Sequence, residues 1–317
     1  MTKIEEIAQG VLAGDRRSIA RAITIVENNT PEAQKLISSI YPHTGKTHII
    51  GLTGPSGSGK STLIEKIVRE YRRRGKTVGV VAVDPTSPFT GGAFLGDRIR
   101  MQELSTDPGV FIRSMATRNY PGGIAKATKD AVKILDAANN DIVMVETVGA
   151  GQSEVEIIKV AQTIVVIHAP GLGDEIQAIK AGLMEIADIF VVNKADRENA
   201  DKALIDIQAM LQLNNKEKTW KPPILKTVAL TGEGVPQLIE KLEEHKQFLE
   251  KEKELRKPLL KAEAELIEAI KEKAVNSIIE ELKKEGKFEE ILQNILEKKI
   301  DPASAAEKLL RGRLRRH

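Results

Sequence analysis

The chain has 317 residues, 41% of them hydrophobic and 29% charged, which is an ordinary composition for a soluble globular protein. The formal net charge of +3 is too small for nucleic-acid binding to be the main task, and the absence of cysteine excludes disulfides, thiol catalysis and Cys-ligated zinc. No apolar run approaches the roughly 18 residues that span a bilayer, so we expect a cytoplasmic protein without membrane contact.

Three parts of the chain differ in their patterns. Residues 1–45 predict an extension of short helices, because apolar residues recur there at helical spacing. Residues 46–250 alternate apolar strands with amphipathic helices. Residues 251–317 are rich in Lys, Glu and Leu and predict a helical arm whose long helix begins near Pro258. Its apolar stripe occupies positions 255, 259, 262, 266, 270, 274, 278 and 282.

The middle part predicts an α/β fold with a mostly parallel central sheet covered by helices. Ile142–Val145 and Ile164–Ile167 are continuous apolar runs, which is typical of strands buried on both faces. The predicted strands are His48–Thr53, Thr77–Val83, Val110–Ser114, Ile142–Glu146, Thr163–His168, Ile189–Asn193 and Ile224–Leu230.

A phosphate-binding P-loop follows the first predicted strand, since Gly54–Ser61 fits G-x-x-x-x-G-K-[ST] without a mismatch. The glycines let successive backbone N–H groups point at phosphate oxygens, and the following helix adds its positive N-terminal dipole. Lys60 is expected to neutralise the β- and γ-phosphates, and Ser61 to ligate Mg²⁺. The residues predicted to contact the nucleotide are Gly54, Pro55, Ser56, Gly57, Ser58, Gly59, Lys60, Ser61 and Thr62.

A second motif selects the base. Asn193, Lys194 and Asp196 form N-K-x-D at the end of a predicted buried strand. A carboxylate at Asp196 accepts hydrogen bonds from both N1–H and N2–H₂ of guanine, a donor pair that adenine lacks. GTP and GDP are therefore the predicted ligands. Ala229 and Leu230 are candidates for a further loop beside the base, with a plain strand end as the alternative.

Three acidic residues at or just beyond strand ends are candidates to complete a magnesium site. Asp84, Asp97 and Glu146 are placed where parallel strands present ligand-binding groups. Each has a structural alternative. Asp84 precedes Pro85 and suits a turn, Asp97 is flanked by arginines that suit a surface ion pair, and Glu146 suits a polar strand end.

Several segments resemble the MeaB/ArgK family of P-loop GTPases, which belong to the SIMIBI class and act as chaperones of adenosylcobalamin-dependent methylmalonyl-CoA mutase. The resemblance implies that Asp84 and Asp97 belong to a first switch and that Glu146 is the acid of the second. It also implies that Lys180 lies in a loop facing a mutase that stimulates GTP hydrolysis, and that the C-terminal arm forms a homodimer. The segments are Val83–Pro88, Thr90–Gly92, Gly96–Met101, Glu146–Glu154 and Gly173–Lys180.

Other functions remain open at this point. A nickel-delivering GTPase would rely on Cys and His clusters, whereas this chain has no Cys and its histidines are scattered. A protein-targeting GTPase would carry T-K-x-D, and a kinase of an amino-acid transport system would prefer ATP. No glutamine occupies the water-activating position of Ras-like GTPases, although Gln152 and Glu154 lie nearby. We therefore expect slow intrinsic hydrolysis that a partner accelerates.

Overall fold

The computed structural model describes residues 2–84, 103–116, 126–147, 157–171, 183–213, 219–253 and 257–314. Asp97 and Lys180 lie outside these ranges, as do most of the segments that carry the family resemblance, and Asp84 is described in its backbone only. The chain divides into two compact units, Met1–Phe248 and Leu249–His317. The prediction of three parts, with boundaries at 45 and 250, stays a prediction.

The first unit is built on a seven-stranded sheet in the order β3-β2-β4-β1-β5-β6-β7, in which every pair of neighbours is parallel. The predicted α/β class is confirmed. The three strands that follow β1 in the sequence lie on one side of β1 in the sheet, and β5 begins the other side. Ligands of such sheets bind at the carboxyl end of the strand where the order reverses in this way, which here is β1. The strands are β1 (His48–Thr53), β2 (Val78–Asp84), β3 (Val110–Ala116), β4 (Ile142–Thr147), β5 (Thr163–His168), β6 (Ile189–Asn193) and β7 (Ile224–Thr227).

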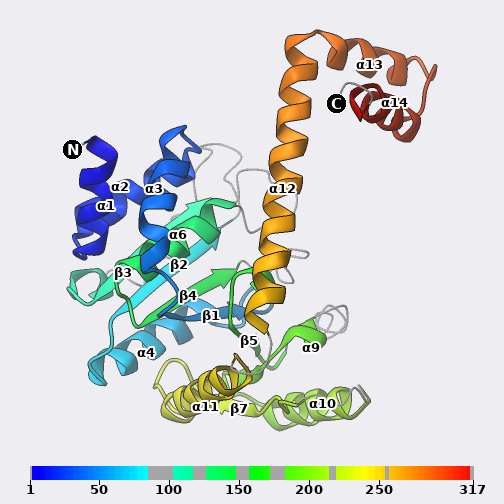
Figure 1. The fold of residues 1–317 in the computed structure, drawn as a ribbon. Helices are drawn as coiled ribbons and strands as arrows, with labels where there is room; N and C mark the ends of the chain where they lie inside the picture. Colours follow the sequence, from blue (N-terminus) through cyan, green and yellow to red (C-terminus); the bar gives the residue numbers. More distant parts are fainter. Residues whose placement is uncertain are drawn as a thin grey trace. The chain divides into compact units, whose positions relative to one another are not determined.

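Helices cover both faces of this sheet (Figure 1). Every residue of β4, β5 and β6 is buried, which explains their continuous apolar sequences. On one face Val143 and Val145 pack in a core with the N-terminal helices and α6 (Lys126–Ala137). On the other face Ile142 and Met144 pack with α4 (Lys60–Arg73) and α11 (Val235–Lys253). Further helices among the described residues of this unit are η1 (Tyr41–His43), η2 (Glu103–Thr106), η3 (Ile157–Lys159), α9 (Leu183–Ile186) and α10 (Ala200–Leu213).

The N-terminal extension forms α1 (Lys3–Leu12), α2 (Arg16–Glu27) and α3 (Glu32–Ile40). Thr2 and Glu5 form a reciprocal capping box at the start of α1, and Asp15 caps α2. The predicted apolar stripes face inward and belong to the same core as the sheet. The link to β1 is held by the buried carboxylate of Asp136, which accepts the backbone N–H groups of residues 45, 46 and 47.

The last predicted strand is shorter than expected. β7 ends at Thr227, and Val228 instead pairs with Glu233 in an isolated antiparallel bridge. A tight turn lies between them, in which the N–H of Gly232 donates to the oxygen of Val228. Gly234 has φ 77°, and a Cβ there would lie 2.1 Å from the oxygen of Lys226, so the turn requires this glycine. The apolar run Val228–Leu230 therefore leaves the sheet.

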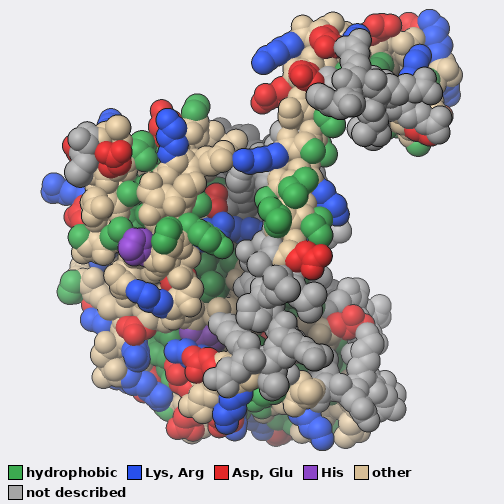
Figure 2. Space-filling model, viewed as in Figure 1, with side chains coloured by type: hydrophobic (Ala, Val, Ile, Leu, Met, Phe, Trp, Pro, Cys, Tyr) green, Lys and Arg blue, Asp and Glu red, His purple; other side chains and the backbone are tan. Residues whose placement is uncertain are grey.

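The second unit consists of α12 (Lys257–Lys284), α13 (Lys287–Leu296) and α14 (Pro302–Leu314). The long helix predicted near Pro258 thus begins at Lys257. Leu282 is buried within the unit, whereas other large apolar side chains of α12 lie exposed along the helix (Figure 2). These exposed residues are Leu266, Ile267, Ile270 and Val275. In the part of the chain that the structure describes, no helix has the length and apolar character needed to cross a bilayer.

Candidate nucleotide-binding site

The loop between β1 and α4 has a backbone that only glycine adopts easily. Gly54, Gly57 and Gly59 have φ values of 136°, 78° and 91°. Close neighbours exclude side chains at two of these positions. A Cβ on Gly54 would lie 2.0 Å from the oxygen of Ile167, and a Cβ on Gly59 would lie 2.4 Å from Nδ2 of Asn193. The glycines therefore allow the P-loop both to curve tightly and to pack closely against β5 and β6.

Lys60 is the first residue of α4 and is mostly buried, with a relative exposure of 8%. Its Nζ donates to the oxygen of Gly54 at 2.7 Å and to that of Pro55 at 3.0 Å. The ammonium is thus held against the loop whose N–H groups would bind phosphate. Together with the positive N-terminus of α4, it makes this loop an electrostatic site for an anion.

Two side-chain oxygens that could be metal ligands face each other beside the P-loop. The hydroxyl of Ser61 donates to Oε1 of Glu146 at 2.7 Å, and Glu146 is 5% exposed at the end of β4. Mg²⁺ prefers such hard oxygen ligands, so this pair fits the ion. Asp84 ends the neighbouring strand β2, one residue beyond the pair Val83–Thr147, which brings its backbone to the same edge of the sheet as Glu146.

The guanine motif is hydrogen-bonded directly to the P-loop. Nδ2 of the buried Asn193 donates to the oxygen of Ser58 at 2.8 Å, and Nζ of Lys194 donates to the oxygen of Gly57 at 2.6 Å. Asp196 follows on the surface, where its carboxylate is exposed and accessible to a base. The end of β6 thus supports the loop from the side of the base.

The side chain of Asn193 also reaches β7. Its Oδ1 accepts hydrogen bonds from the hydroxyl of Thr227 and from the N–H of Ala229, both at 3.1 Å. Donors around Oδ1 and an acceptor beside Nδ2 fix the orientation of the amide. Ala229 is buried with its N–H engaged in this way, while Leu230 is 78% exposed. No role for Thr227 could be predicted from the sequence, because a threonine at a strand end belongs to no recognisable motif.

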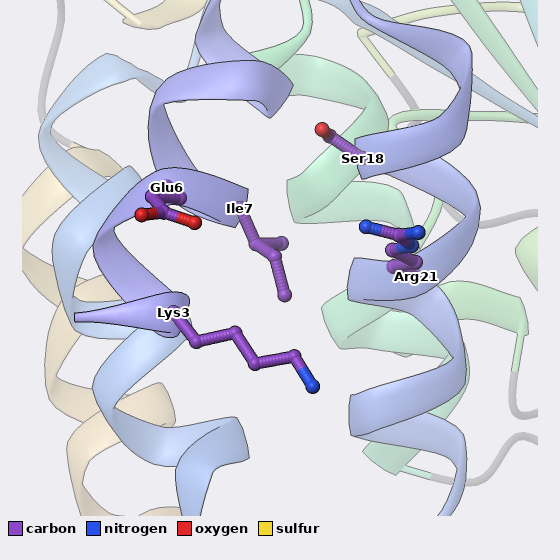
Figure 3. A pocket seen from close by; sticks show the side chains of 5 residues that line it. All are labelled: Lys3, Glu6, Ile7, Ser18 and Arg21. Atoms are coloured by element: carbon purple, nitrogen blue, oxygen red, sulfur yellow. The ribbon is translucent and has the colours of Figure 1, made fainter. Parts of the chain in front are cut away.

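The structure thus brings Lys60, Ser61, Glu146, Asn193 and Lys194 together around one loop. A separate pocket of about 410 Å³ lies between α1 and α2, lined by Lys3, Glu6, Ile7, Ser18 and Arg21 (Figure 3). None of the predicted nucleotide ligands contributes to it. Within the described residues, the hydrogen bonds around the P-loop therefore define the nucleotide site better than the shape of this pocket does.

Comparisons with known proteins agree with this geometry. Residues 19–285 match the family described as methylmalonyl-CoA mutase-associated GTPase MeaB. A protein of Pyrococcus horikoshii that is named as a GTPase is 54% identical over 318 residues, covering 98% of this chain and 98% of its own. The GTPase ArgK of Escherichia coli is 38% identical over 233 residues, covering 71% and 70% of the two chains.

A solved structure extends the likeness to the whole fold. The crystal structure of an LAO/AO transport system kinase superposes with a TM-score of 0.72 at 25% identity, and the match covers 98% of each chain. The family match covers most of this chain and includes the P-loop, Glu146 and the N-K-x-D motif. The chain therefore belongs to the MeaB family of P-loop GTPases and is a GTPase.

Proposed function

We propose that this GTPase is a switch that assists an adenosylcobalamin-dependent acyl-CoA mutase, methylmalonyl-CoA mutase or a relative, in loading or protecting its cofactor. The family description, which names an association with methylmalonyl-CoA mutase, supports the partner. One structural observation supports the proposed switch function, namely the hydrogen bond between Ser61 and Glu146. It joins the P-loop to the strand end from which the segment resembling the second switch departs.

The proposed metal is Mg²⁺, held by Ser61 and Glu146, with Asp84 and Asp97 as further acids. When bound, the ion would neutralise charge on the phosphates of GTP. The protein's own residues supply the rest. Lys60 offers an ammonium to the β- and γ-phosphates, Asp196 recognises guanine, and Asn193 keeps the end of β6 against the P-loop. Because Ser61 lies in the P-loop and Glu146 lies on β4, residues of both segments would hold the ion, which would couple nucleotide binding to β4.

We include slow intrinsic hydrolysis in this function, because the sequence has no glutamine at the water-activating position of Ras-like GTPases. The mutase would supply the acceleration through the loop that contains Lys180. A nucleotide-controlled contact of this kind is a recurrent mode of switching. The cysteine-free composition supports a cytoplasmic location as part of the same proposal.

We further propose a homodimer formed through the C-terminal arm. Leu266, Ile267, Ile270 and Val275 are large apolar side chains that are between 44% and 61% exposed on one helix. Exposed apolar residues that recur along a helix are typical of a helix–helix interface. The same four residues are the ones that a partner helix would remove from water.

The experiment measures GTP hydrolysis by the full chain with increasing amounts of the cobalamin-dependent mutase from the same organism. We expect acceleration that saturates with mutase, and loss of activity in Lys60→Ala. Lys180→Ala should keep the intrinsic rate and lose most of the acceleration. A rate that does not change at any mutase concentration would reject the partner. Acceleration by a nickel enzyme instead, or phosphate transfer from ATP to a transport protein, would favour the alternatives.

A further inference from the structure

Two buried threonine hydroxyls connect the strands that carry the P-loop and Glu146. Oγ1 of Thr147 donates to Oγ1 of Thr53 at 2.9 Å, and the two residues are 1% and 0% exposed. Thr53 is the last residue of β1 and directly precedes Gly54 of the P-loop. Thr147 is the last residue of β4 and directly follows Glu146. This hydrogen bond thus joins the residue before the P-loop to the residue after Glu146.

This contact lies where the backbone no longer holds the two strands together. The ladder between β1 and β4 ends at the pair Leu52–Glu146. Beyond it, Thr53 pairs with Val166 of β5, while Thr147 pairs with Val83 of β2. The last residue of each strand is therefore paired with its outer neighbour in the sheet and not with the other strand. The hydroxyl pair extends the connection between β1 and β4 by one residue, at the carboxyl ends of the strands, where the nucleotide is proposed to bind.

The neighbouring contact shows what depends on this connection. Ser61, at the far end of the P-loop, meets Glu146 at 2.7 Å. The P-loop is therefore attached to consecutive residues of β4 at both its ends, through Thr53 to Thr147 and through Ser61 to Glu146. Because metal and nucleotide ligands must be held within a fraction of an ångström, the first contact limits how far Glu146 moves relative to Ser61.

We propose that Thr53 and Thr147 are positioning residues for GTP hydrolysis, whose paired hydroxyls fix Glu146 relative to Ser61. The inference rests on the proposed magnesium role of these two ligands. A pair that only stabilised the fold would change the unfolding temperature and leave the metal dependence of the reaction unaltered. A positioning pair changes the metal dependence as well.

The test uses Thr53→Val, Thr147→Val and the double variant in the full chain. Valine keeps the size and the strand preference of threonine and replaces only the hydroxyl, by a methyl group. We expect kcat for intrinsic GTP hydrolysis to fall about tenfold and the Mg²⁺ concentration for half-maximal rate to rise. KM for GTP should stay within about twofold, because the guanine contacts are untouched. The double variant should have the same kcat as the less active single variant, since either substitution already breaks the hydrogen bond.

Two further variants separate positioning from packing. Thr147→Ser keeps the hydroxyl and should restore most of the rate and the wild-type Mg²⁺ dependence. Thr163→Val removes a buried hydroxyl at the opposite end of β5, where Thr163 contacts His48 and His245. It should lower stability and leave kcat and Mg²⁺ dependence unchanged. Thermal unfolding and GDP binding verify that each variant is folded.

Several outcomes would overturn the proposal. These are wild-type rate and Mg²⁺ dependence in both valine variants, additive losses in the double variant, or equal losses in Thr147→Ser and Thr147→Val. Glu146→Gln distinguishes this failure from that of the magnesium site. If Glu146→Gln alters the Mg²⁺ dependence while the valine variants do not, only the positioning role is rejected. If Glu146→Gln has no effect, the metal assignment and the positioning role are both rejected.

Discussion

At the scale of single residues, the site depends on one buried amide. Asn193 contacts the P-loop through Nδ2, and Thr227 and Ala229 of the β7 end through Oδ1. A buried polar group that loses its partner costs about 1–3 kcal/mol, so each of these contacts constrains the others. The P-loop and the N-K-x-D motif are therefore one hydrogen-bonded structure.

Gly59→Ala should disrupt this structure. The residue has φ 91°, and its Cβ would lie 2.4 Å from Nδ2 of Asn193. We expect GTP affinity to fall at least about tenfold, because the loop and the asparagine cannot keep their positions. Gly45→Ala is the matched control, since Gly45 has φ 98° but nothing within 4 Å of the added atom. It should cost about 1 kcal/mol of stability and leave affinity unchanged, and an equal loss of affinity in both variants would contradict the argument.

Asp196→Asn tests the base-reading role. The amide offers one acceptor and one donor where guanine presents two donors, so an unfavourable contact replaces a hydrogen bond. We expect GTP affinity to fall by several kcal/mol while the weak affinity for ATP changes little. Competition titrations with GTP and ATP measure the ratio. If the preference for GTP survived the substitution, Asp196 would not be the residue that selects guanine.

These residues also show what the sequence could reveal of the site. Lys60, Asn193 and Asp196 occupy motifs whose spacing reflects one ligand, so the sequence predicts a role for each of them. Thr53, Thr147 and Thr227 belong to no motif, and they meet only because parallel strands that are distant in sequence end at the same edge. Their contacts depend on tertiary structure. Asp97, predicted from its place beyond a strand end, and Lys180, predicted from the resemblance, lie outside the described residues, so their roles stay predictions.

At the scale of elements, boundaries followed the sequence where burial determined them. β1 and β5 have the predicted limits, because their apolar runs coincide with the strands that lie at the centre of the sheet. β7 lies at an edge, and its partly exposed residues carry a weaker signal. There the turn around Gly232 and Gly234 competes with the apolar pattern and ends the strand at Thr227.

The entry to β3 contains an ion pair whose contribution depends on pH. The hydrogen bond from the Arg72 side chain is the largest influence on the pKa of Asp107 and lowers it. Burial opposes this effect, and the N–H of Gly109 adds a further lowering contribution. A carboxyl with a lowered folded pKa contributes stability that is present above its unfolded pKa of about 3.9. This contribution is lost as the pH falls through the folded pKa.

Asp107→Asn should therefore destabilise the protein by about 1 kcal/mol at neutral pH. The difference from the wild type should narrow as the pH falls below about 4, because the carboxyl of the unfolded wild type is then protonated first and that of the folded protein at lower pH. Denaturant unfolding at a series of pH values measures this. A difference in stability that stayed constant across the series would show that the charge of Asp107 contributes nothing.

At the scale of the whole molecule, the proposal combines a GTPase unit with an apolar arm and an acyl-CoA mutase. The sequence predicted a long C-terminal helix from one apolar stripe, and α12 confirms the helix. The stripe alone could not determine what covers it, because a buried face within one subunit and an interface between subunits have the same pattern. The exposure of Leu266 and Ile270 is the observation that favours an interface.

Replacing Leu266 and Ile270 together by Glu should convert the proposed dimer into monomers. Two charges in an apolar interface would be costly to bury without partners. Lys271→Glu on the same helix makes the same change in net charge at an exposed polar position and should leave the dimer intact. Sedimentation velocity distinguishes the two forms. A dimer that persisted in the double variant would place the interface elsewhere.

The most direct test of the switch is the affinity of the mutase for the two nucleotide states of this chain. Calorimetric titration would use the full chain loaded with Mg²⁺ and either GDP or a non-hydrolysable GTP analogue. We expect the mutase to bind both nucleotide states, with dissociation constants that differ by at least about fivefold, the lower end of typical allosteric coupling. Equal affinities for the two states, or no binding in either, would contradict it.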